Sequence, residues 1–529
     1  MPRNVAKNLA GAAGVIAVLT VFSRLAGLLR KLAQSWAMSD GSVASAYDTA
    51  NTVPNVLFEV TAGGALAGAV IPLIAGYAAN KQRAELNQTV SALISWILVI
   101  GVPAAGIVAV AAHPITVFLF GAETDSAVIA LAAVLLQLFA LQIPLYGLSV
   151  VFTGVLQAHG RFVLPALSPF LSSLAVISVF SFYAKNIGHQ VPADQLSMPG
   201  VLLLGAGTTL GVVIFSLPQM IPLRKNIRFK FTLRFPQGTG RRAAALAGAG
   251  LAALLAQQIT IVVIMIVANL TGGIGAYTTF SYAYTVFMVP YGVLAVPVAT
   301  AVFPKISAAV ELNNREQTVR LVCQSTKIVF LMGAAAASLL IALAHPAKIV
   351  LEVGRDIQNL DFAMQMMAGG LVGFSLLYHV ARVLYALGYG KKVVIQNSIA
   401  WGSGCISLLI WLGSGISGRE SALRAIGFSL TLGLSIGALL SLYSIVQVLG
   451  RKSLTGIGKL IFAAALIFAP LTWMALQLVE VIIASLNATV LAAFAAALAG
   501  SILILFGAAL VFVFTNRKEL QLLKNSPRD

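Results

Sequence analysis

Three cationic side chains lie inside the first long apolar stretch of the chain. Arg24, Arg30 and Lys31 interrupt a segment that is otherwise almost uncharged from residue 9 to residue 38. A charge at the centre of a bilayer costs about 2.5–3.5 kcal/mol on insertion scales, so such residues usually serve a function. Arg24 and Lys31 share one helix face, whereas Arg30 points about 120° away. The two arginines could line one cavity if the helix bends, and Gly27 is the predicted position of that bend.

The second apolar stretch supplies two carboxylates at matching depths. Counted from a turn near Gly41, Asp48 lies about as deep as Arg30, and Glu59 about as deep as Arg24. Two ion pairs are therefore predicted. The carboxylates either only neutralise the arginines or compete for them with an anionic ligand. A further alternative is that Arg30 and Lys31 extend to the outer headgroups.

Few other residues in the apolar stretches could act on a ligand. Arg382 is predicted near the inner end of the tenth stretch, where it either assists in anion binding or extends to the inner surface. Proline bends a helix because it removes a backbone donor. Pro54 and Pro290 are therefore predicted to take part in gating, although such bends are also common in membrane bundles without that role.

The sequence contains no recognisable catalytic, metal or nucleotide motif. The five histidines are scattered, and there is no HExxH, no paired CxxC, no Walker loop and no nucleophile elbow. Cys323 and Cys405 both lie in or beside apolar segments, which does not support a disulfide framework. The prediction is a transporter with no catalytic residues, no metal and no cofactor.

Composition predicts an all-α polytopic membrane protein. Hydrophobic residues make up 59% of the 529 residues and charged residues 9%. The chain holds about 14 apolar stretches, each long enough to span a bilayer. With the N-terminus inside, about 24 of the 34 basic residues fall on inner loops and tails and about 5 on outer loops. This asymmetry explains the net charge of +18 without a nucleic-acid partner, and it places both termini in the cytoplasm.

An internal repeat predicts the domain organisation. The segment 68–77 (GAVIPLIAGY) resembles 300–309 (TAVFPKISAA), and 155–161 (VLQAHGR) resembles 383–389 (VLYALGY). Six helices per unit would give a parallel repeat of two lobes. The predicted parts are an N-terminal lobe at 1–222, a basic cytoplasmic linker at 223–242, a C-terminal lobe at 243–448, and two final helices with a tail at 449–529.

The linker between the lobes is strongly basic. Seven Lys and Arg residues lie between Arg224 and Arg242, with Pro236, Gly238 and Gly240 supplying turns. The linker either binds anionic lipid headgroups of the inner leaflet or only sets the topology.

The chain resembles the MurJ-type (MviN-type) lipid II flippases of the multidrug/oligosaccharidyl-lipid/polysaccharide exporter superfamily. The family pattern S-R-x-x-G-x-x-R is similar to Ser23, Arg24, Gly27 and Arg30, and its second-helix P-N to Pro54-Asn55. Further similar positions are Gly64, Ala65, Pro72, Gly154, Leu156, Arg161, Phe162, Pro165, Pro169, Pro290, Gly292, Val293, Leu294, Pro304, Ser307 and Arg382. The resemblance implies fourteen helices, a bacterial plasma membrane, and alternating-access translocation of lipid II.

The same resemblance implies which residues bind the substrate. Arg24 and Arg30 would hold the diphosphate, with Ser23, Asn55, Lys31 and Arg382 assisting. The last two helices would help to shape a groove for the lipid tail.

The chain departs from the family pattern at several charged positions. Family members often carry a cation where this chain has Phe58-Glu59 and Thr285, and an acid where it has Lys31. Positive charge should therefore concentrate in the N-terminal lobe. Gln257, Gln258 and Asn397 lie in the two helices where some members carry the acids of a sodium site, which argues against sodium coupling.

Three other functions remain open at this stage. The chain could export a different polyprenyl-diphosphate-linked oligosaccharide, which needs the same cations. It could be a cation-coupled drug antiporter, which should have unpaired acids facing its cavity. It could also be a scaffold without transport activity that recruits cell-wall synthesis proteins.

Overall fold

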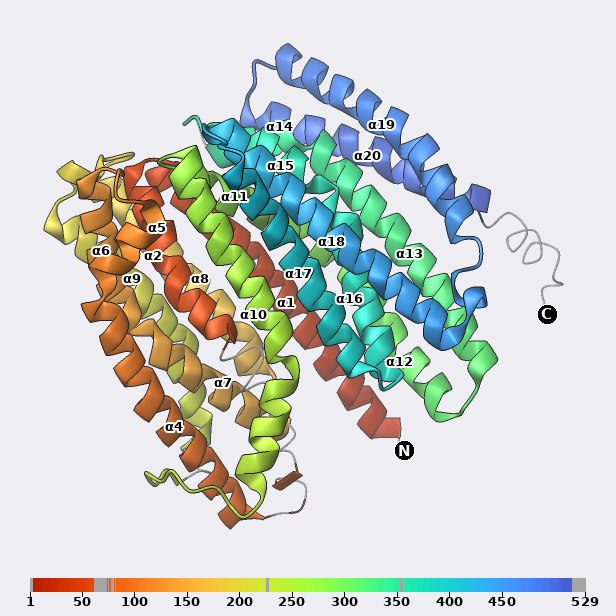
Figure 1. Ribbon diagram of the computed structural model, residues 1–529, viewed down its shortest axis with the longest axis horizontal. Helices are drawn as coiled ribbons and strands as arrows, with labels where there is room; N and C mark the ends of the chain where they lie inside the picture. The colour runs from red at the N-terminus through yellow and green to blue at the C-terminus, as the bar shows by residue number, and fades with distance from the viewer. Residues whose placement is uncertain are drawn as a thin grey trace. The chain divides into compact units, whose positions relative to one another are not determined.

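The computed structural model describes residues 3–60, 74, 76, 77, 80, 82–224, 228–352 and 355–515, with the backbone alone for 3–18, 20, 21 and 242–250. The described chain is helical and contains no strand within those ranges (Figure 1). Helices dominate because a backbone in lipid must satisfy its own hydrogen bonds. The chain divides into two compact units, residues 1–278 and 279–529.

The first unit contains nine α-helices in its described part. Their bounds are α1 Arg3–Met38, α2 Ser42–Phe58, α4 Arg83–Val110, α5 Ala112–Phe120, α6 Ser126–Ala140, α7 Gln142–Ala158, α8 Val163–Asn186, α9 Met198–Ser216 and α10 Thr239–Gly272, with short 3-10 turns η2 Ala193–Gln195 and η3 Leu217–Leu223. Helix α10 packs against α5 and α2. The predicted boundary of the C-terminal lobe at residue 243 stays a prediction.

The second unit begins within α11 and includes the final helix pair. Its elements are α11 Ala276–Pro290, the π-helical segment η4 Tyr291–Ala295, α12 Val296–Glu311, α13 Arg315–Ala342, α14 Ala344–Glu352, α15 Leu360–Ala368, α16 Gly370–Ala386, α17 Gly390–Gly413, α18 Arg419–Leu449, η5 Arg451–Leu454, α19 Ile457–Ser485 and α20 Val490–Thr515. Helices α19 and α20 run side by side and pack on α13 (Figure 1).

The prediction of an all-α membrane protein is confirmed. The described residues contain eleven helices long and apolar enough to cross a membrane, or twelve if α15 and α16, bent by 48°, form one span. The predicted number of fourteen stays a prediction.

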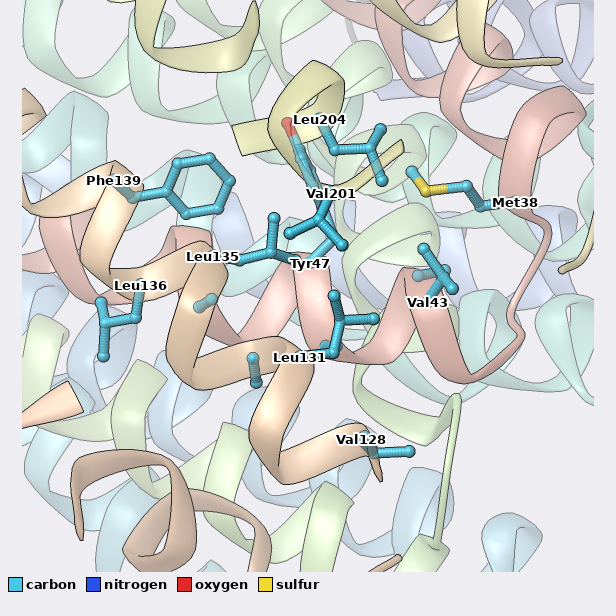
Figure 2. Close-up of a cluster of buried hydrophobic side chains, with 14 of the residues drawn as sticks. Met38, Val43, Tyr47, Val128, Leu131, Leu135, Leu136, Phe139, Val201 and Leu204 are labelled. Carbon is cyan, nitrogen blue, oxygen red and sulfur yellow. The ribbon is translucent and has the colours of Figure 1, made fainter. Parts of the chain in front are cut away.

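The core of the first unit is built where α2 meets α6 and α9. Figure 2 shows Tyr47 of α2 among apolar side chains of α6 and α9, with Met38 from the end of α1 beside them. The ring of Tyr47 makes edge-on contacts with Phe139 and Phe180. Its hydroxyl is satisfied by Thr208, with 2.9 Å between the oxygens. This packing fixes α2, and through α2 the polar residues described below.

The internal repeat is visible in the helix boundaries. Helices α4 and α13 begin 232 residues apart, at Arg83 and Arg315, and end the same distance apart. Helices α5 and α14 keep that offset. Helices α7 and α16 begin and end 228 residues apart, and each follows a break from the preceding helix. The 68–77 landmark lies mostly outside the described residues, so only its counterpart in α12 can be placed.

The second landmark folds identically in the two units. After α7, the N–H of Gly160 donates to Gln157 O and that of Arg161 to Leu156 O. After α16, the corresponding N–H groups, of Gly388 and Tyr389, donate to the corresponding carbonyls. Gly160 and Gly388 have φ of +72° and +80°, a conformation that favours glycine at a helix C-terminus. The repeat is therefore a property of the backbone as well as of the sequence.

Candidate functional site: the cations of the first helix

Helix α1 carries Ser23, Arg24, Arg30 and Lys31 without a break at Gly27. A Cβ at Gly27 would meet no other atom within 4 Å, so close packing does not require glycine there. The Ser23 hydroxyl lies 2.8 Å from the carbonyl oxygen of Leu19 and 3.0 Å from that of Ala166. The second contact ties α1 to α8. A hinge at Gly27 and a substrate contact at Ser23 stay predictions.

Lys31 is neutralised by an ion pair with α2. Its Nζ atom lies 3.0 Å from Asp48 Oδ1 and donates to Gln34 Oε1 at 2.9 Å. Gln34 Nε2 donates to the other Asp48 oxygen at 2.9 Å. The Lys31 and Asp48 side chains are only 15% and 5% exposed. Burial removes water from both charged groups, and a buried ion pair is stable only when hydrogen bonds replace that water. Here Gln34 and the two charged groups supply those hydrogen bonds to one another.

This geometry corrects the predicted partner of Asp48. The sequence paired Asp48 with Arg30 by depth, whereas the structure pairs it with Lys31. Adjacent residues of a helix point 100° apart, so only one of the two can face α2 at this crossing. Gln34, three residues after Lys31, lies on the same helix face, and its hydrogen bonds further favour Lys31 as the partner of Asp48.

Arg30 lies beside two tyrosines. It interacts electrostatically with the hydroxyls of Tyr47 and Tyr146. Tyr146, in α7, donates to Asn55 Oδ1 at 3.1 Å, and its ring stacks on Phe58 with centroids 4.4 Å apart. Tyr146 thus bonds to an amide of α2 and interacts electrostatically with Arg30 of α1. The Arg30 guanidinium and the Tyr146 hydroxyl are donor groups of the kind that phosphate oxygens accept hydrogen bonds from.

The predicted pair between Arg24 and Glu59 is not formed. Arg24 is exposed, and neither it nor Arg30 makes an ion pair or hydrogen bond with another described residue. Ser23 faces α8, so Arg24 is turned about 100° away from that contact. Glu59 is exposed just beyond the end of α2 and interacts electrostatically with Tyr146. Counting residues placed Arg24 and Glu59 at similar depths, but their side chains do not point toward each other.

Arg382 lies in the second unit, on α16. Its Nη1 donates to Thr300 Oγ1 of α12 at 2.9 Å, and its Nη2 donates to the Tyr378 hydroxyl. The guanidinium carbon also lies 4.5 Å from the centroid of the Tyr378 ring. No carboxylate pairs with Arg382 in the part of the chain that the structure describes. Its positive charge is oriented by neutral groups and remains available to an anion.

The predicted gating prolines occupy different environments. Pro54 is buried inside α2. Pro290 is the last residue of α11 and leads into the π-helical segment at Tyr291. Tyr291 contacts Tyr378, the residue that holds Arg382, with ring centroids 5.6 Å apart. Single π-helical turns are frequent at functional sites. Gating by either proline stays a prediction.

Sequence reasoning missed the polar residues that orient the cations. Gln34, Tyr146 and Tyr378 were not singled out. A buried tyrosine in an apolar span usually finds a partner for its hydroxyl, and this was the available signal for the two tyrosines. Within the described residues, no three His, Cys, Asp or Glu side chains gather closely enough to hold a metal ion. Cys323 and Cys405 are free thiols.

The comparison with known protein families shows which family this chain belongs to. Residues 35–497 match the family described as Lipid II flippase MurJ. The chain belongs to this family. The family is one of membrane transporters in peptidoglycan biosynthesis rather than of enzymes, and the many apolar helices described above agree with a multi-pass membrane protein.

Individual MurJ proteins are similar over different lengths. The probable lipid II flippase MurJ of Synechocystis sp. is 32% identical over 231 residues, 43% of this chain and 42% of that protein. The match therefore spans less than half of that relative. The lipid II flippase MurJ of Burkholderia cenocepacia is 26% identical over 389 residues, 72% of this chain and 73% of that protein.

Solved structures agree on the fold. A structure titled as lipid II flippase MurJ in an inward closed conformation has a TM-score of 0.75 at 20% identity, covering 96% of this chain and 99% of its own. An inward-facing multidrug resistance MATE transporter of the MOP superfamily has a TM-score of 0.67 at 17% identity, covering 82% and 98%. At these identities the likeness shows the fold alone.

Proposed function

We propose that this protein moves lipid II, the lipid-linked peptidoglycan precursor, from the inner to the outer leaflet of a bacterial plasma membrane. Family membership supports the substrate class. Arg24 and Arg30 bind the diphosphate, because a guanidinium presents several N–H donors in a geometry suited to phosphate oxygens. Arg382 assists from the second unit.

The observation that supports this proposal is that the neighbouring cations on α1 differ in whether they have a carboxylate partner. Lys31 is already paired with a carboxylate, whereas Arg24 and Arg30 have no carboxylate partner among the described residues. A cation inside an apolar segment is costly unless something compensates it. A diphosphate supplies the missing negative charge. In this proposal Lys31 assists only when its pair with Asp48 opens.

Alternating access of two lobes is the proposed mechanism. The repeated helix boundaries support two similar units that could move as bodies. An inside-negative membrane potential would favour outward passage of an anion, by about 2.3 kcal/mol per charge at 100 mV. Both termini are proposed to be cytoplasmic. A reporter fused after Asp529 that reads periplasmic would contradict this orientation.

Three other functions remain as alternatives. An exporter of another polyprenyl-diphosphate-linked oligosaccharide would need the same free arginines. A cation-coupled drug antiporter would need a free acid facing its cavity, and Glu59, which is exposed just beyond α2, is the candidate. A scaffold for cell-wall synthesis proteins would need no lipid binding at all.

Reconstitution distinguishes these functions. Purified protein in liposomes should move labelled lipid II between leaflets, and the Arg24→Ala variant should not. Movement of a different polyprenyl-diphosphate sugar with lipid II left behind would favour the first alternative. Cation-driven efflux of a drug without lipid movement would favour the second. A protein that moves neither but is still required for wall synthesis would favour the scaffold.

A further inference from the structure

The described part of the chain between η3 and α10 forms a distinct feature on the surface of the first unit. Its part from residue 228 to residue 235, here called the linker segment, has neither helical nor strand structure. Its sequence, RFKFTLRF, alternates cationic or polar residues with apolar ones. A cytoplasmic loop would be polar throughout, and a membrane span would be uncharged. The linker segment matches neither pattern.

Four side chains of α4 hold the backbone of the linker segment. The N–H groups of Lys230 and Thr232 donate to Ser91 Oγ at 3.2 Å and to Ser95 Oγ at 3.1 Å. Trp96 Nε1 donates to the carbonyl of Leu233 at 3.1 Å, and Gln88 Nε2 to that of Arg234 at 3.1 Å. The segment is therefore attached to α4 through its backbone, which leaves the side chains of Arg228, Phe229 and Lys230 free for other contacts.

Most side chains of the linker segment are exposed. Phe229 is 51% exposed and Phe231 61%, and the neighbouring Arg228 and Lys230 are also exposed. Trp96, at the site of attachment, is 38% exposed. Exposed aromatic rings suit the headgroup region of a membrane, and neighbouring cations are attracted to the anionic lipids there. Tryptophan is enriched at that same level.

A cavity opens beneath the linker segment. It has a volume of about 320 Å³ and is walled by apolar side chains of α4, α7 and η3, with Phe229 of the linker segment as a further wall. Arg224 is the one charged residue in its lining. Among the described residues, none of Arg224, Arg228, Lys230 and Arg234 has a carboxylate partner. An apolar chamber beside unpaired cations matches an amphiphile with an anionic head.

We propose that this cavity binds an anionic phospholipid from the leaflet on the linker's side of the membrane. One acyl chain occupies the cavity between α4 and α7, and the phosphate lies against Arg224 and Lys230. A zwitterionic phospholipid offers the same chains, but its ammonium group offsets the attraction to the cations. The site is independent of the helix α1 cations and of lipid II transport.

Trp96 provides a built-in probe of this site. Full-length protein is placed in phosphatidylcholine nanodiscs that contain a minor fraction of lipid with brominated chains, either phosphatidylglycerol or phosphatidylcholine. Bromine quenches nearby tryptophan, and subtracting the signal of Trp96→Phe isolates the Trp96 contribution. At equal mole fraction, brominated phosphatidylglycerol should quench Trp96 several-fold more strongly. Equal quenching by the two lipids would overturn the proposal.

Variants separate this site from a diffuse charge effect. Arg224→Gln and Lys230→Gln should each weaken the preference for phosphatidylglycerol about fivefold, the effect of one cation near an anionic surface. Arg224→Lys should retain the preference. Lys391→Gln, which removes an exposed charge at the start of α17, should have no effect. A loss with Lys391→Gln as large as with Arg224→Gln would leave only a net-charge effect and refute the site.

The cavity itself is tested by filling it. Leu148→Phe enlarges one wall residue without changing any charge, and it should abolish the preference because the acyl chain no longer fits. An unchanged preference in Leu148→Phe would refute occupancy of the cavity. Displacement of the brominated lipid by lipid II at low mole fraction would assign the cavity to the transported lipid instead. If Arg224→Gln does not fold, the exposed Lys230→Gln decides the charge contribution.

Discussion

The ammonium of Lys31 lies 3.0 Å from the Asp48 carboxylate, in a buried pair that joins α1 to α2. Gln34 bridges the two residues and completes their hydrogen bonding. Of Arg24, Arg30 and Lys31, the three cations inside the apolar stretch of α1, Lys31 is thereby neutralised by the protein itself. Arg24 and Arg30 have no such partner among the described residues, and this difference decides which positions should matter for an anionic substrate.

Replacing Arg24 with alanine should abolish function in vivo while the protein still inserts at normal levels. The reason is that Arg24 makes no hydrogen bond or ion pair with another described residue, so its removal should cost binding rather than stability. Complementation of a flippase-deficient strain, together with immunoblotting of membranes, measures both. Lys459→Ala, an exposed cation at the start of α19, is the control expected to be silent. Full complementation by Arg24→Ala would refute a substrate role.

Substrate capture should depend more on α1 than on α10 and α11. Arg30→Ala should weaken lipid II binding by about 1.5–3 kcal/mol, the range for a charge-assisted hydrogen bond. Thr285→Ala should cost less, because the Thr285 hydroxyl already donates to Ser281 O at 2.9 Å within its own helix. Gln257→Ala and Gln258→Ala should also cost less. Binding to purified variants compares them, and larger losses from these three would reverse the predicted asymmetry.

Breaking the Lys31–Asp48 pair should destabilise the protein. Lys31→Met leaves a carboxylate that is 5% exposed without its cation, which should lower the free energy of unfolding by about 3 kcal/mol. The double variant Lys31→Met/Asp48→Asn removes both charges and should lose less. Thermal unfolding in nanodiscs measures the difference. If the double variant proves less stable than Lys31→Met, the pair is not the reason for the loss.

Two tyrosines near Arg30 should respond differently to loss of their hydroxyls. Tyr146→Phe removes the donor to Asn55 and should weaken lipid II binding by about 1 kcal/mol, one neutral hydrogen bond, with little loss of stability. Tyr47→Phe removes the contact with Thr208 in the core and should reduce stability with little effect on binding. Binding and unfolding are measured on both variants. If Tyr146→Phe and Tyr47→Phe both reduce stability and leave binding unchanged, the Tyr146 hydroxyl has only a structural role.

A methyl group at Gly433 should disrupt the packing of α17 on α18. A Cβ there would lie 2.4 Å from the carbonyl oxygen of Ala400 and 2.8 Å from the nitrogen of Gly404. Gly433→Ala should therefore lower stability by about 1–3 kcal/mol through overpacking. Gly402→Ala, on α17 where a Cβ meets nothing within 4 Å, is the matched control and should be neutral. Equal unfolding temperatures for the two variants would contradict this close approach.

The fold could be read from the sequence because its determinants are local and repeated. Hydropathy predicts helices, since a backbone in lipid has few alternatives. The similarity of 155–161 to 383–389 predicted a duplicated unit, and the turns at Gly160 and Gly388 share the same hydrogen bonds. Those turns depend on a glycine at positive φ, which a sequence shows directly.

By itself the sequence determined that charge is concentrated in the first helix and that a carboxylate lies at the depth of Arg30 and Lys31. Only the tertiary structure decided that Asp48 pairs with Lys31 and that Arg30 has no carboxylate partner among the described residues. Depth along a helix follows from counting residues at a fixed rise, so spacing predicts it. The direction of each side chain depends on how two helices are rotated about their own axes, and packing with α6 and α7 sets that rotation for α2.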